Sequence, residues 1–255
     1  MSSGGAESTQ TRLEELCAAF KLPTIREELV ERLSSAGHEK ALGALLEIFE
    51  LEAADRAERR CDRLRRASKL PLGKTIETLE QERLPTKLAR QVQSLCKGEF
   101  VDTCENVLAF GPPGAGKSHV VAAIGHALVE RGRSVLFVPA FRLVQELLAA
   151  KRDLDLPRAL RKLDRFDVLI VDDLGYVQHS ADDAEVLFTL MAERYERRSM
   201  VITSNLVFSQ WDQIFQNPMA TAAAIDRIVH HATILELDVP SYRSEKAKSK
   251  KGSKA

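Results

Sequence analysis

A glycine-rich loop directly after an apolar strand is the feature that most constrains the fold of this chain. Residues 106–118 read NVLAFGPPGAGKS and contain the complete spacing G-x-x-x-x-G-K-[ST]. A phosphate-binding loop of this kind needs a strand before it and a helix after it, because its backbone N–H groups converge on phosphate oxygens at a helix N-terminus. Residues 107–110 are apolar, and Val120, Ile124 and Leu128 recur behind the loop at helical spacing. The sequence therefore predicts a nucleotide-binding α/β fold.

Each position of the loop has a distinct expected role. Its glycines allow a tight turn, Lys117 brings a cation to the β- and γ-phosphate oxygens, and the Ser118 hydroxyl is a ligand for Mg²⁺. We expect ATP and Mg²⁺ as the bound cofactors. The residues expected to hold them are Gly111, Pro112, Pro113, Gly114, Ala115, Gly116, Lys117, Ser118 and His119.

Two further apolar runs end in polar side chains. VLIV is followed by Asp172 and Asp173, and MVIT leads to Asn205. In a parallel sheet these side chains lie at the edge where the phosphates bind. We expect Asp172 to hold Mg²⁺, Asp173 to orient or activate the attacking water, and Asn205 to sense the γ-phosphate. The alternative is that the acids mark a plain strand end and that Asn205 begins a loop.

The chain is long enough for one α/β domain with a smaller appendage, at 255 residues of which 44 % are hydrophobic. We expect a small all-α N-terminal domain over residues 1–67, a linker over 68–103, the nucleotide-binding domain over 104–243 and a basic disordered tail over 244–255. Apolar runs alternate with helical stretches, which is typical of a parallel sheet covered by helices. The expected strands are 107–110, 135–138, 168–171, 200–203 and 233–237.

Composition argues against membrane and disulfide-rich classes. No apolar run reaches the roughly 20 residues that span a bilayer, and the start MSSGGAESTQ lacks an export signal, so we expect no membrane contact and a cytoplasmic location. The four cysteines include no C-x-x-C pair. His230 and His231 are adjacent but lack companion ligands in the sequence, so we assign them no metal.

The N-terminal module combines a helix-start signal with a basic stripe. Thr24 and Glu27 predict a capping box. A later helix carries arginines on one side, where they would follow the phosphate backbone of double-stranded DNA. The alternative is an ordinary solvated helix, since Glu52 and Asp55 each precede an arginine by four residues. The stripe consists of Arg56, Arg59, Arg60 and Arg63.

The motifs together resemble a known family. GPPGAGKSH, LIVDDLGYV, ERYERRSMVITSN and AAAIDRIVHH with SYRS follow one another in order, and LCAAFKLPTIREEL extends the likeness to the N-terminal region. They resemble the IstB-like helper ATPases of bacterial insertion sequences, which are AAA+ proteins akin to DnaC-type helicase loaders. The resemblance implies an AAA+ P-loop NTPase that hydrolyses ATP at sites completed between subunits of a homo-oligomer. It also implies assembly on target DNA and activation of a partner transposase.

The resemblance assigns further residues. Arg227 resembles the arginine finger and Arg243 the sensor-2 arginine, roles that suit a permanently charged guanidinium. The alternative for Arg227 is a surface residue paired with an acid, and for Arg243 a part of the basic tail. Lys151 and Arg152 lie where loaders and initiators have an inserted helical element, which makes them candidate DNA contacts. Many AAA+ ATPases carry glutamate where this chain has Asp173, so we expect slow hydrolysis.

Two other functions remain open from the sequence. A replicative helicase loader of the DnaC type would share the ATPase domain but act on a helicase, whereas the N-terminal module here resembles the transposition family. A nucleotide-gated interaction protein would bind ATP with negligible hydrolysis. Phosphate release with and without DNA, compared with a Lys117→Ala variant, separates that last possibility from an ATPase.

Overall fold

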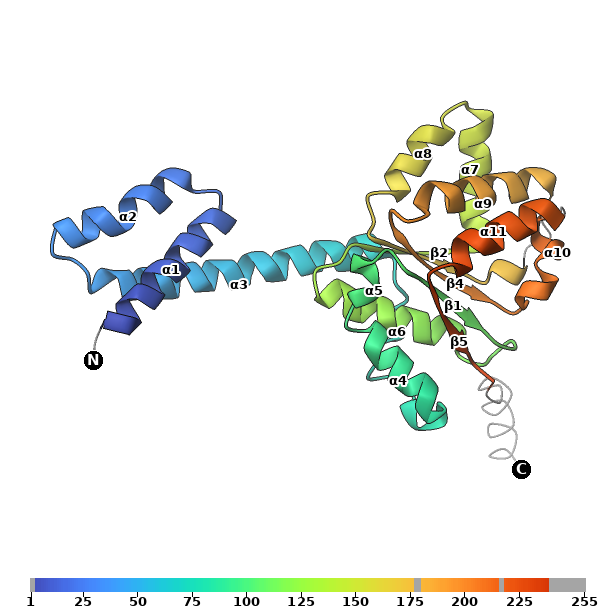
Figure 1. Ribbon diagram of the computed structural model, residues 1–255, viewed down its shortest axis with the longest axis horizontal. Helices are drawn as coiled ribbons and strands as arrows, with labels where there is room; N and C mark the ends of the chain where they lie inside the picture. Colours follow the sequence, from blue (N-terminus) through green and yellow to red (C-terminus); the bar gives the residue numbers. More distant parts are fainter. Residues whose placement is uncertain (1–2, 177–179, 216–217, 239–255) are drawn as a thin grey trace, which may run out of the picture. The chain divides into compact units, whose positions relative to one another are not determined.

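The computed structural model describes residues 3–176, 180–215 and 218–238. The chain divides into two compact units, Met1–Asp62 and Arg63–Ala255 (Figure 1). The boundary falls a few residues before the one expected from the sequence, within a continuous helix, α3 (Ala41–Ser68). The helix therefore belongs to both units.

The first unit is helical, as α1 (Ser3–Ala19) and α2 (Pro23–Ser35) pack with the first part of α3. Leu13, Leu16 and Cys17 are buried within it. The predicted capping box at Thr24 is wrong, because α2 begins one residue earlier and no side chain caps its N-terminus. Pro23 explains the earlier start, since its ring presets φ for the first helical position and it has no N–H to satisfy.

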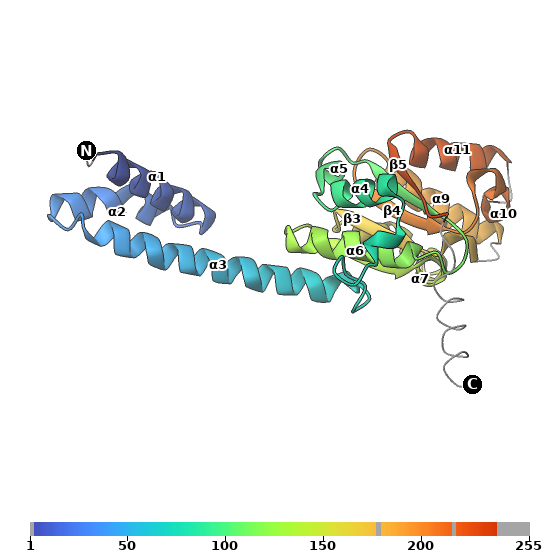
Figure 2. The ribbon, with the colours of Figure 1, turned by 90° about the horizontal axis from the view of Figure 1, so that it is seen from below.

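The second unit is built on a parallel sheet in the order β2-β3-β4-β1-β5 (Figures 1 and 2). The sequence prediction of five strands and of an α/β fold is confirmed, and β4 lies between β1 and β3. The three central strands, β1, β3 and β4, are wholly buried, which explains their continuous apolar runs, whereas β5 at the edge of the sheet is mostly half-buried. They are β1 (Asn106–Phe110), β2 (Val135–Pro139), β3 (Val168–Asp172), β4 (Ser199–Ser204) and β5 (Ala232–Glu236).

Helices cover both faces of this sheet (Figures 1 and 2). One face carries the main apolar core, to which α7 (Ala140–Arg152), α8 (Leu156–Leu163), α9 (Ala181–Arg194), α10 (Asp212–Phe215) and α11 (Pro218–Val229) contribute. The other face is covered by α6 (Lys117–Glu130), together with α4 (Thr86–Leu95) and α5 (Glu99–Asp102). Short 3₁₀ turns occur at Gln81–Arg83, Leu174–Tyr176 and Phe208–Gln210.

Residues 68–103, expected to be a linker, lie within the second compact unit. Leu88, Val92 and Leu95 of α4 are buried, as is Leu70 before it. The Pro and Gly residues that interrupt the helical pattern made this stretch resemble a connection, but its apolar side chains help to cover the α6 side of the sheet. Within the described residues, no helix is long and apolar enough to cross a membrane.

Candidate functional site

The glycine-rich loop joins β1 to α6 and depends on backbone conformations that favour glycine. Gly111 has φ 155°, Gly114 84° and Gly116 93°. At Gly111 a Cβ would lie 2.5 Å from the carbonyl oxygen of Leu237, just beyond β5. A side chain there would push the end of β5 away from β1. The loop is therefore fixed by both backbone conformation and close packing.

Lys117 is the first residue of α6 and is only 5 % exposed. Its Nζ donates hydrogen bonds to the carbonyl oxygens of Gly111, at 2.7 Å, and Pro112, at 3.0 Å. These bonds hold the ammonium against the loop, and half-buried Ser118 follows it in the first turn of the helix. The cation and the positive end of the helix dipole thus meet at one place, which suits an anionic ligand.

The twin carboxylates follow β3 and are tied to the neighbouring strand by Thr203. The Thr203 hydroxyl, buried on β4, donates to Asp172 Oδ1 at 2.7 Å. The hydroxyl oxygen of Thr203, Oγ1, in turn accepts a hydrogen bond from the Asp173 backbone N–H at 2.8 Å. Asp173 has a left-handed φ of 61°, which aspartate tolerates better than most residues, so the chain turns sharply after Asp172. Thr203 thereby positions both acids.

Sequence reasoning did not single out Thr203, the last residue of the expected strand 200–203, two positions before Asn205. A hydroxyl side chain at a buried position of a central strand was the available signal, because such a group needs a hydrogen-bond partner. Only the strand order revealed which partner it has, since β4 is adjacent to β3.

Asn205 follows β4 and carries an unsatisfied buried atom. Its side-chain Oδ1 is buried and has no hydrogen-bond partner within the described residues. The side chain lies so close to Gly175 that a Cβ added to that glycine would overlap Oδ1. Buried amide oxygens are normally hydrogen-bonded, so an unpaired one just after β4, the strand next to β3, fits an acceptor for a water molecule.

The sheet order brings three motifs to one edge. Because β1, β3 and β4 are adjacent and parallel, the loop after β1, Asp172 at the end of β3 and Asn205 after β4 lie at their shared carboxyl ends. The hydroxyl of Ser118 and the carboxylate of Asp172 are hard oxygen donors of the kind that Mg²⁺ prefers. Together the residues fit a magnesium-nucleotide site.

Arg227 is not brought to this edge within its own chain. It lies near the end of α11, shortly before β5 begins, and thus towards the opposite, amino edge of the sheet. Its Nη1 donates to the Ala223 carbonyl oxygen at 3.1 Å, and its guanidinium carbon lies 4.9 Å from the centre of the Phe188 ring. The acid pairing considered from the sequence is absent among the contacts of the described residues. Arg243 lies outside those residues.

The N-terminal arginines include the predicted helical ion pairs. Arg56 Nε lies 2.6 Å from Glu52 Oε1, and Arg59 Nη2 lies 3.1 Å from Asp55 Oδ2. The Arg56 guanidinium also lies over the Phe20 ring at 4.2 Å. All four arginines of the stripe are exposed. Exposed pairs of this kind contribute little energy, so they do not prevent these side chains from contacting phosphates.

Lys151, at the end of α7, is engaged by α9. Its Nζ donates to Asp182 Oδ1 at 3.0 Å and Glu185 Oε2 at 2.9 Å. The hydrogen bonds to Glu185 and then Asp182 raise the pKa of Lys151. Both carboxylates compete with any phosphate for this ammonium, while neighbouring Arg152 is exposed.

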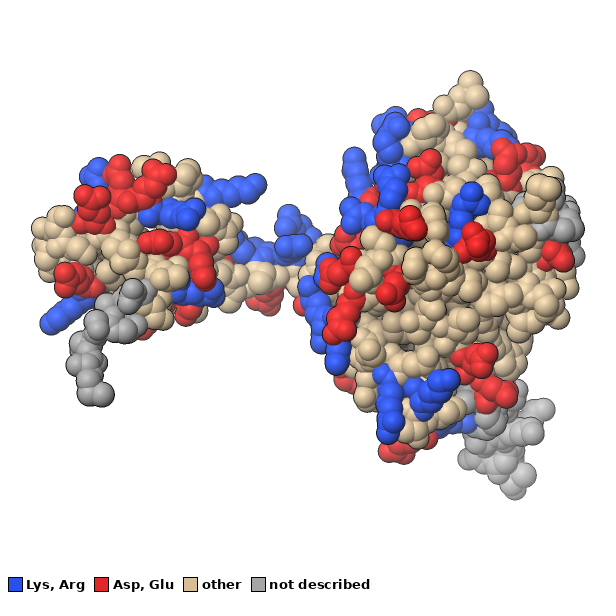
Figure 3. Space-filling view, in the orientation of Figure 1, with Lys and Arg blue, Asp and Glu red and all other residues tan. Residues whose placement is uncertain are grey.

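A second basic surface, which the sequence reasoning missed, lies on and just after α8 (Figure 3). The leucines of this helix pack against the main core. Its basic residues stand on the exposed side, and their spacing of three and four residues was the available signal. We call this set the α8 basic surface; it consists of Arg158, Arg161, Lys162 and Arg165, all exposed.

Arg194 is a buried cation in the sequence ERYERRSM, and its contacts are structural. Only 1 % of it is exposed, and it donates to the carbonyl oxygens of Leu163 at 3.0 Å, Phe166 at 3.1 Å and Ser199 at 3.0 Å. Burial lowers the pKa of Arg194 to about 10. The side chain joins the α8–β3 loop to the start of β4.

Solved structures share the fold of the second unit. The DnaI crystal structure matches 63 % of this chain and 88 % of its own, with a TM-score of 0.51 and 22 % identity. The replication initiator DnaA, bound to AMPPCP and single-stranded DNA, matches 71 % of this chain and 56 % of its own, with a TM-score of 0.56 and 16 % identity. At these identities the likeness establishes the AAA+ P-loop fold alone.

Sequence comparison extends over nearly the whole chain. An insertion sequence ATP-binding protein of Sinorhizobium fredii is 44 % identical, covering 93 % of this chain and 81 % of its own length. The IS5376 ATP-binding protein of Geobacillus stearothermophilus is 33 % identical, covering 91 % and 93 %. The family model described as IstB-like ATP binding protein matches residues 6–251. These matches support an ATP-binding role, and the chain belongs to the family of IstB-like ATP binding proteins.

Proposed function

We propose that this protein binds ATP with Mg²⁺ at the loop between β1 and α6 and hydrolyses it to ADP and phosphate. The observation that carries the proposal is the meeting of Lys117, Asp172 and Asn205 at one edge of the sheet. Ser118 and Asp172 would hold the Mg²⁺, which when bound neutralises charge on the β- and γ-phosphates. The loop, with Lys117, would bind the phosphates themselves.

The remaining polar groups would act on the attacking water. The Asp173 carboxylate would orient or activate it as a general base, and the unpaired Asn205 Oδ1 would accept one of its hydrogens. Aspartate is one methylene shorter than glutamate, so its reach towards the water is poorer. We therefore expect slow turnover, which suits a switch that persists while ATP is bound.

Phosphate release tests this step. We expect Mg²⁺-dependent release that is faster with double-stranded DNA and absent in Lys117→Ala. Turnover no higher than that of the Lys117→Ala control, with ATP still bound by the wild-type protein, would instead favour the nucleotide-gated interaction protein. If the folded wild-type protein does not bind ATP at all, both the ATPase and the nucleotide-gated interaction protein are excluded.

We infer that the ATP site is completed by Arg227 of a neighbouring copy. The position of α11 near the opposite sheet edge supports action between subunits, with Arg243 as a second proposed phosphate contact.

Mixing Lys117→Ala with Arg227→Ala tests the inference, because the first variant would supply Arg227 and the second an intact loop. We expect little hydrolysis from either alone and a measurable recovery in the mixture. Normal turnover by Arg227→Ala would exclude the role, and Arg142→Ala, on exposed α7 surface, is the control.

We further propose that the oligomer assembles on double-stranded DNA and stimulates a partner transposase. The names of the relatives as insertion sequence ATP-binding proteins support this function over helicase loading. The arginine stripe, Arg152 and the α8 basic surface are the proposed DNA contacts, with Lys151 a weaker candidate because of its two carboxylate partners. Stimulation of strand transfer by the transposase, but not of helicase loading, is the expected result.

Salt dependence of DNA binding tests the stripe. Neutralising Arg60 and Arg63 together should reduce the slope of log affinity against log salt by about 1.8, from about 0.9 for each lost phosphate contact. Arg32→Ala, an exposed arginine of α2 that is paired with Glu28, serves as the control. An unchanged slope in the double variant would assign the stripe to an ordinary solvated helix surface.

A further inference from the structure

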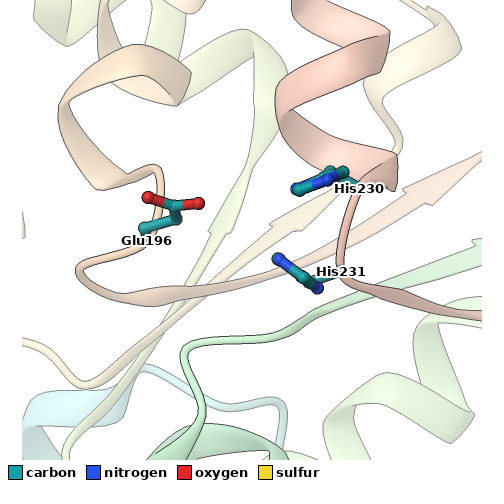
Figure 4. Close-up of side chains that lie close together, drawn as sticks. All are labelled: Glu196, His230 and His231. Atoms are coloured by element: carbon teal, nitrogen blue, oxygen red, sulfur yellow. The ribbon is translucent and has the colours of Figure 1, made fainter.

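Glu196, His230 and His231 form an exposed cluster away from the nucleotide loop (Figure 4). One ligand atom from each side chain lies within 4.8 Å of the others. The histidine side chains point towards the glutamate, which lies in the loop between α9 and β4. Sequence reasoning found no companion ligand for the two histidines and assigned them no metal. Glu196 is distant in sequence and is brought to them by the fold.

Asn106, the first residue of β1, holds together the two segments that carry these ligands. Its backbone N–H donates to the His231 carbonyl oxygen at 2.8 Å, and its side-chain Nδ2 donates to the Ile228 carbonyl oxygen at 3.1 Å. Its Oδ1 accepts from the Met200 N–H at 2.9 Å, on the strand that follows Glu196. This buried side chain thus sets the spacing between the α11–β5 turn and the start of β4, so the ligand positions are largely pre-organised.

Nearby groups orient the ligands further. The Tyr195 hydroxyl lies 3.3 Å from His230 Nδ1, within hydrogen-bond distance. Such outer contacts fix the orientation of metal-binding imidazoles in known sites. Glu196 is held at a left-handed φ of 54°, in the short connection between Arg194 and β4. The backbone that carries the Glu196 carboxylate is therefore held at one end by α9 and at the other by β4.

We propose that Glu196, His230 and His231 bind a divalent transition-metal ion of the zinc class. Two imidazoles and one carboxylate suit Zn²⁺, Co²⁺ or Ni²⁺, whereas Mg²⁺ prefers ligand sets made of oxygen. Three protein ligands leave at least one coordination position for water or another group. The three ligand atoms lie up to 4.8 Å apart, which is farther than two ligands of one ion usually are, so small side-chain rotations would bring them to coordination distance.

This site is distinct from the proposed magnesium position at Ser118 and Asp172. Glu196 precedes β4, and the histidines precede β5, so all three lie at the amino edge of the parallel sheet. The nucleotide loop follows β1 at the carboxyl edge. A five-residue strand such as β1 separates the two edges by roughly 17 Å. An ion in the cluster would join the α9–β4 loop to the α11–β5 turn.

Zinc calorimetry and Co²⁺ absorption on tag-free, reduced protein without nucleotide test the proposal. We expect one Zn²⁺ per chain with a micromolar dissociation constant, unaffected by millimolar Mg²⁺. Glu196→Gln, His230→Ala and His231→Ala should each weaken binding at least about tenfold and abolish the Co²⁺ ligand-field bands. His38→Ala, an exposed histidine of the first unit, should change neither measurement.

Two outcomes would overturn the site. One is the absence of zinc binding by the wild-type protein at millimolar concentrations. The other is unchanged affinity in the His230→Ala, His231→Ala double variant, which would assign binding to other groups such as the four cysteines. The three ligands are exposed, so the variants should fold, and unchanged Trp211 fluorescence verifies this. Metal binding is the readout, so failure here would leave the proposed ATPase function untouched.

Discussion

Replacing Thr203 by valine should lower the free energy of unfolding of the second unit, by an amount that follows from the two hydrogen bonds of the Thr203 hydroxyl. The hydroxyl donates to Asp172 Oδ1 and accepts from Asp173 N–H, and all of these groups lie in or next to the buried sheet. A hydrogen bond to a charged group contributes about 1.5–3 kcal/mol and a neutral one about 0.5–1.5 kcal/mol. The buried methyl group that valine has in place of the hydroxyl offsets about 1 kcal/mol of the lost hydrogen-bond energy. We therefore expect the free energy of unfolding to fall by about 1–3.5 kcal/mol.

Urea unfolding followed by tryptophan fluorescence measures this loss. Trp211 is the only tryptophan of the chain and is fully buried in the second unit, so it reports on that unit rather than on the helical module. A double-mutant cycle with Asp172→Ala isolates the pair from the packing change. We expect a coupling energy of at least about 1 kcal/mol between the two positions. A coupling energy below about 0.3 kcal/mol would refute the assignment of Thr203 as the residue that positions the acids.

Three further predictions concern single residues of the second unit. Burial raises the pKa of Asp167, but hydrogen bonds from Ser134 and the charges of nearby arginines lower it overall. The ionised Asp167 carboxylate should therefore stabilise the fold fully above its unfolded-state pKa of about 3.9, and this stabilisation should be lost as the pH falls through its lower pKa in the folded protein. The stability difference between wild type and Asp167→Asn, measured by urea unfolding, should therefore shrink below about pH 4, and a constant difference would contradict this. Arg194→Lys should lower the free energy of unfolding by about 2–4 kcal/mol, because lysine cannot satisfy several carbonyl oxygens at once. A melting temperature equal to that of the wild type would show that these hydrogen bonds do not stabilise the fold. Gly175→Ala should displace Asn205 and reduce hydrolysis about tenfold while ATP affinity changes little, and unaltered turnover would separate Asn205 from the reaction.

Much of the second unit was predictable because its signals are local. The glycine spacing, the apolar runs and the acids after VLIV each depend on neighbouring residues, so the five strands and the α/β fold were anticipated and the structure confirms them. The interpretation of residues 68–103 as a linker shows the limit of this approach. Short helices that pack on an existing surface have weak patterns of their own, and their burial depends on a partner that is distant in sequence.

The sequence by itself determined that a phosphate-binding loop precedes a helix and that two other strands end in acids and an amide, since covalent order and periodicity encode these features. Only the tertiary structure decided which side chains meet. The placement of β4 between β3 and β1 gives Thr203 its contact with Asp172, and the bonding of Asn106 to both β4 and the α11–β5 turn accompanies the approach of Glu196 to the two histidines. Strand order depends on how buried surfaces pack across the whole sheet, and no local pattern records it.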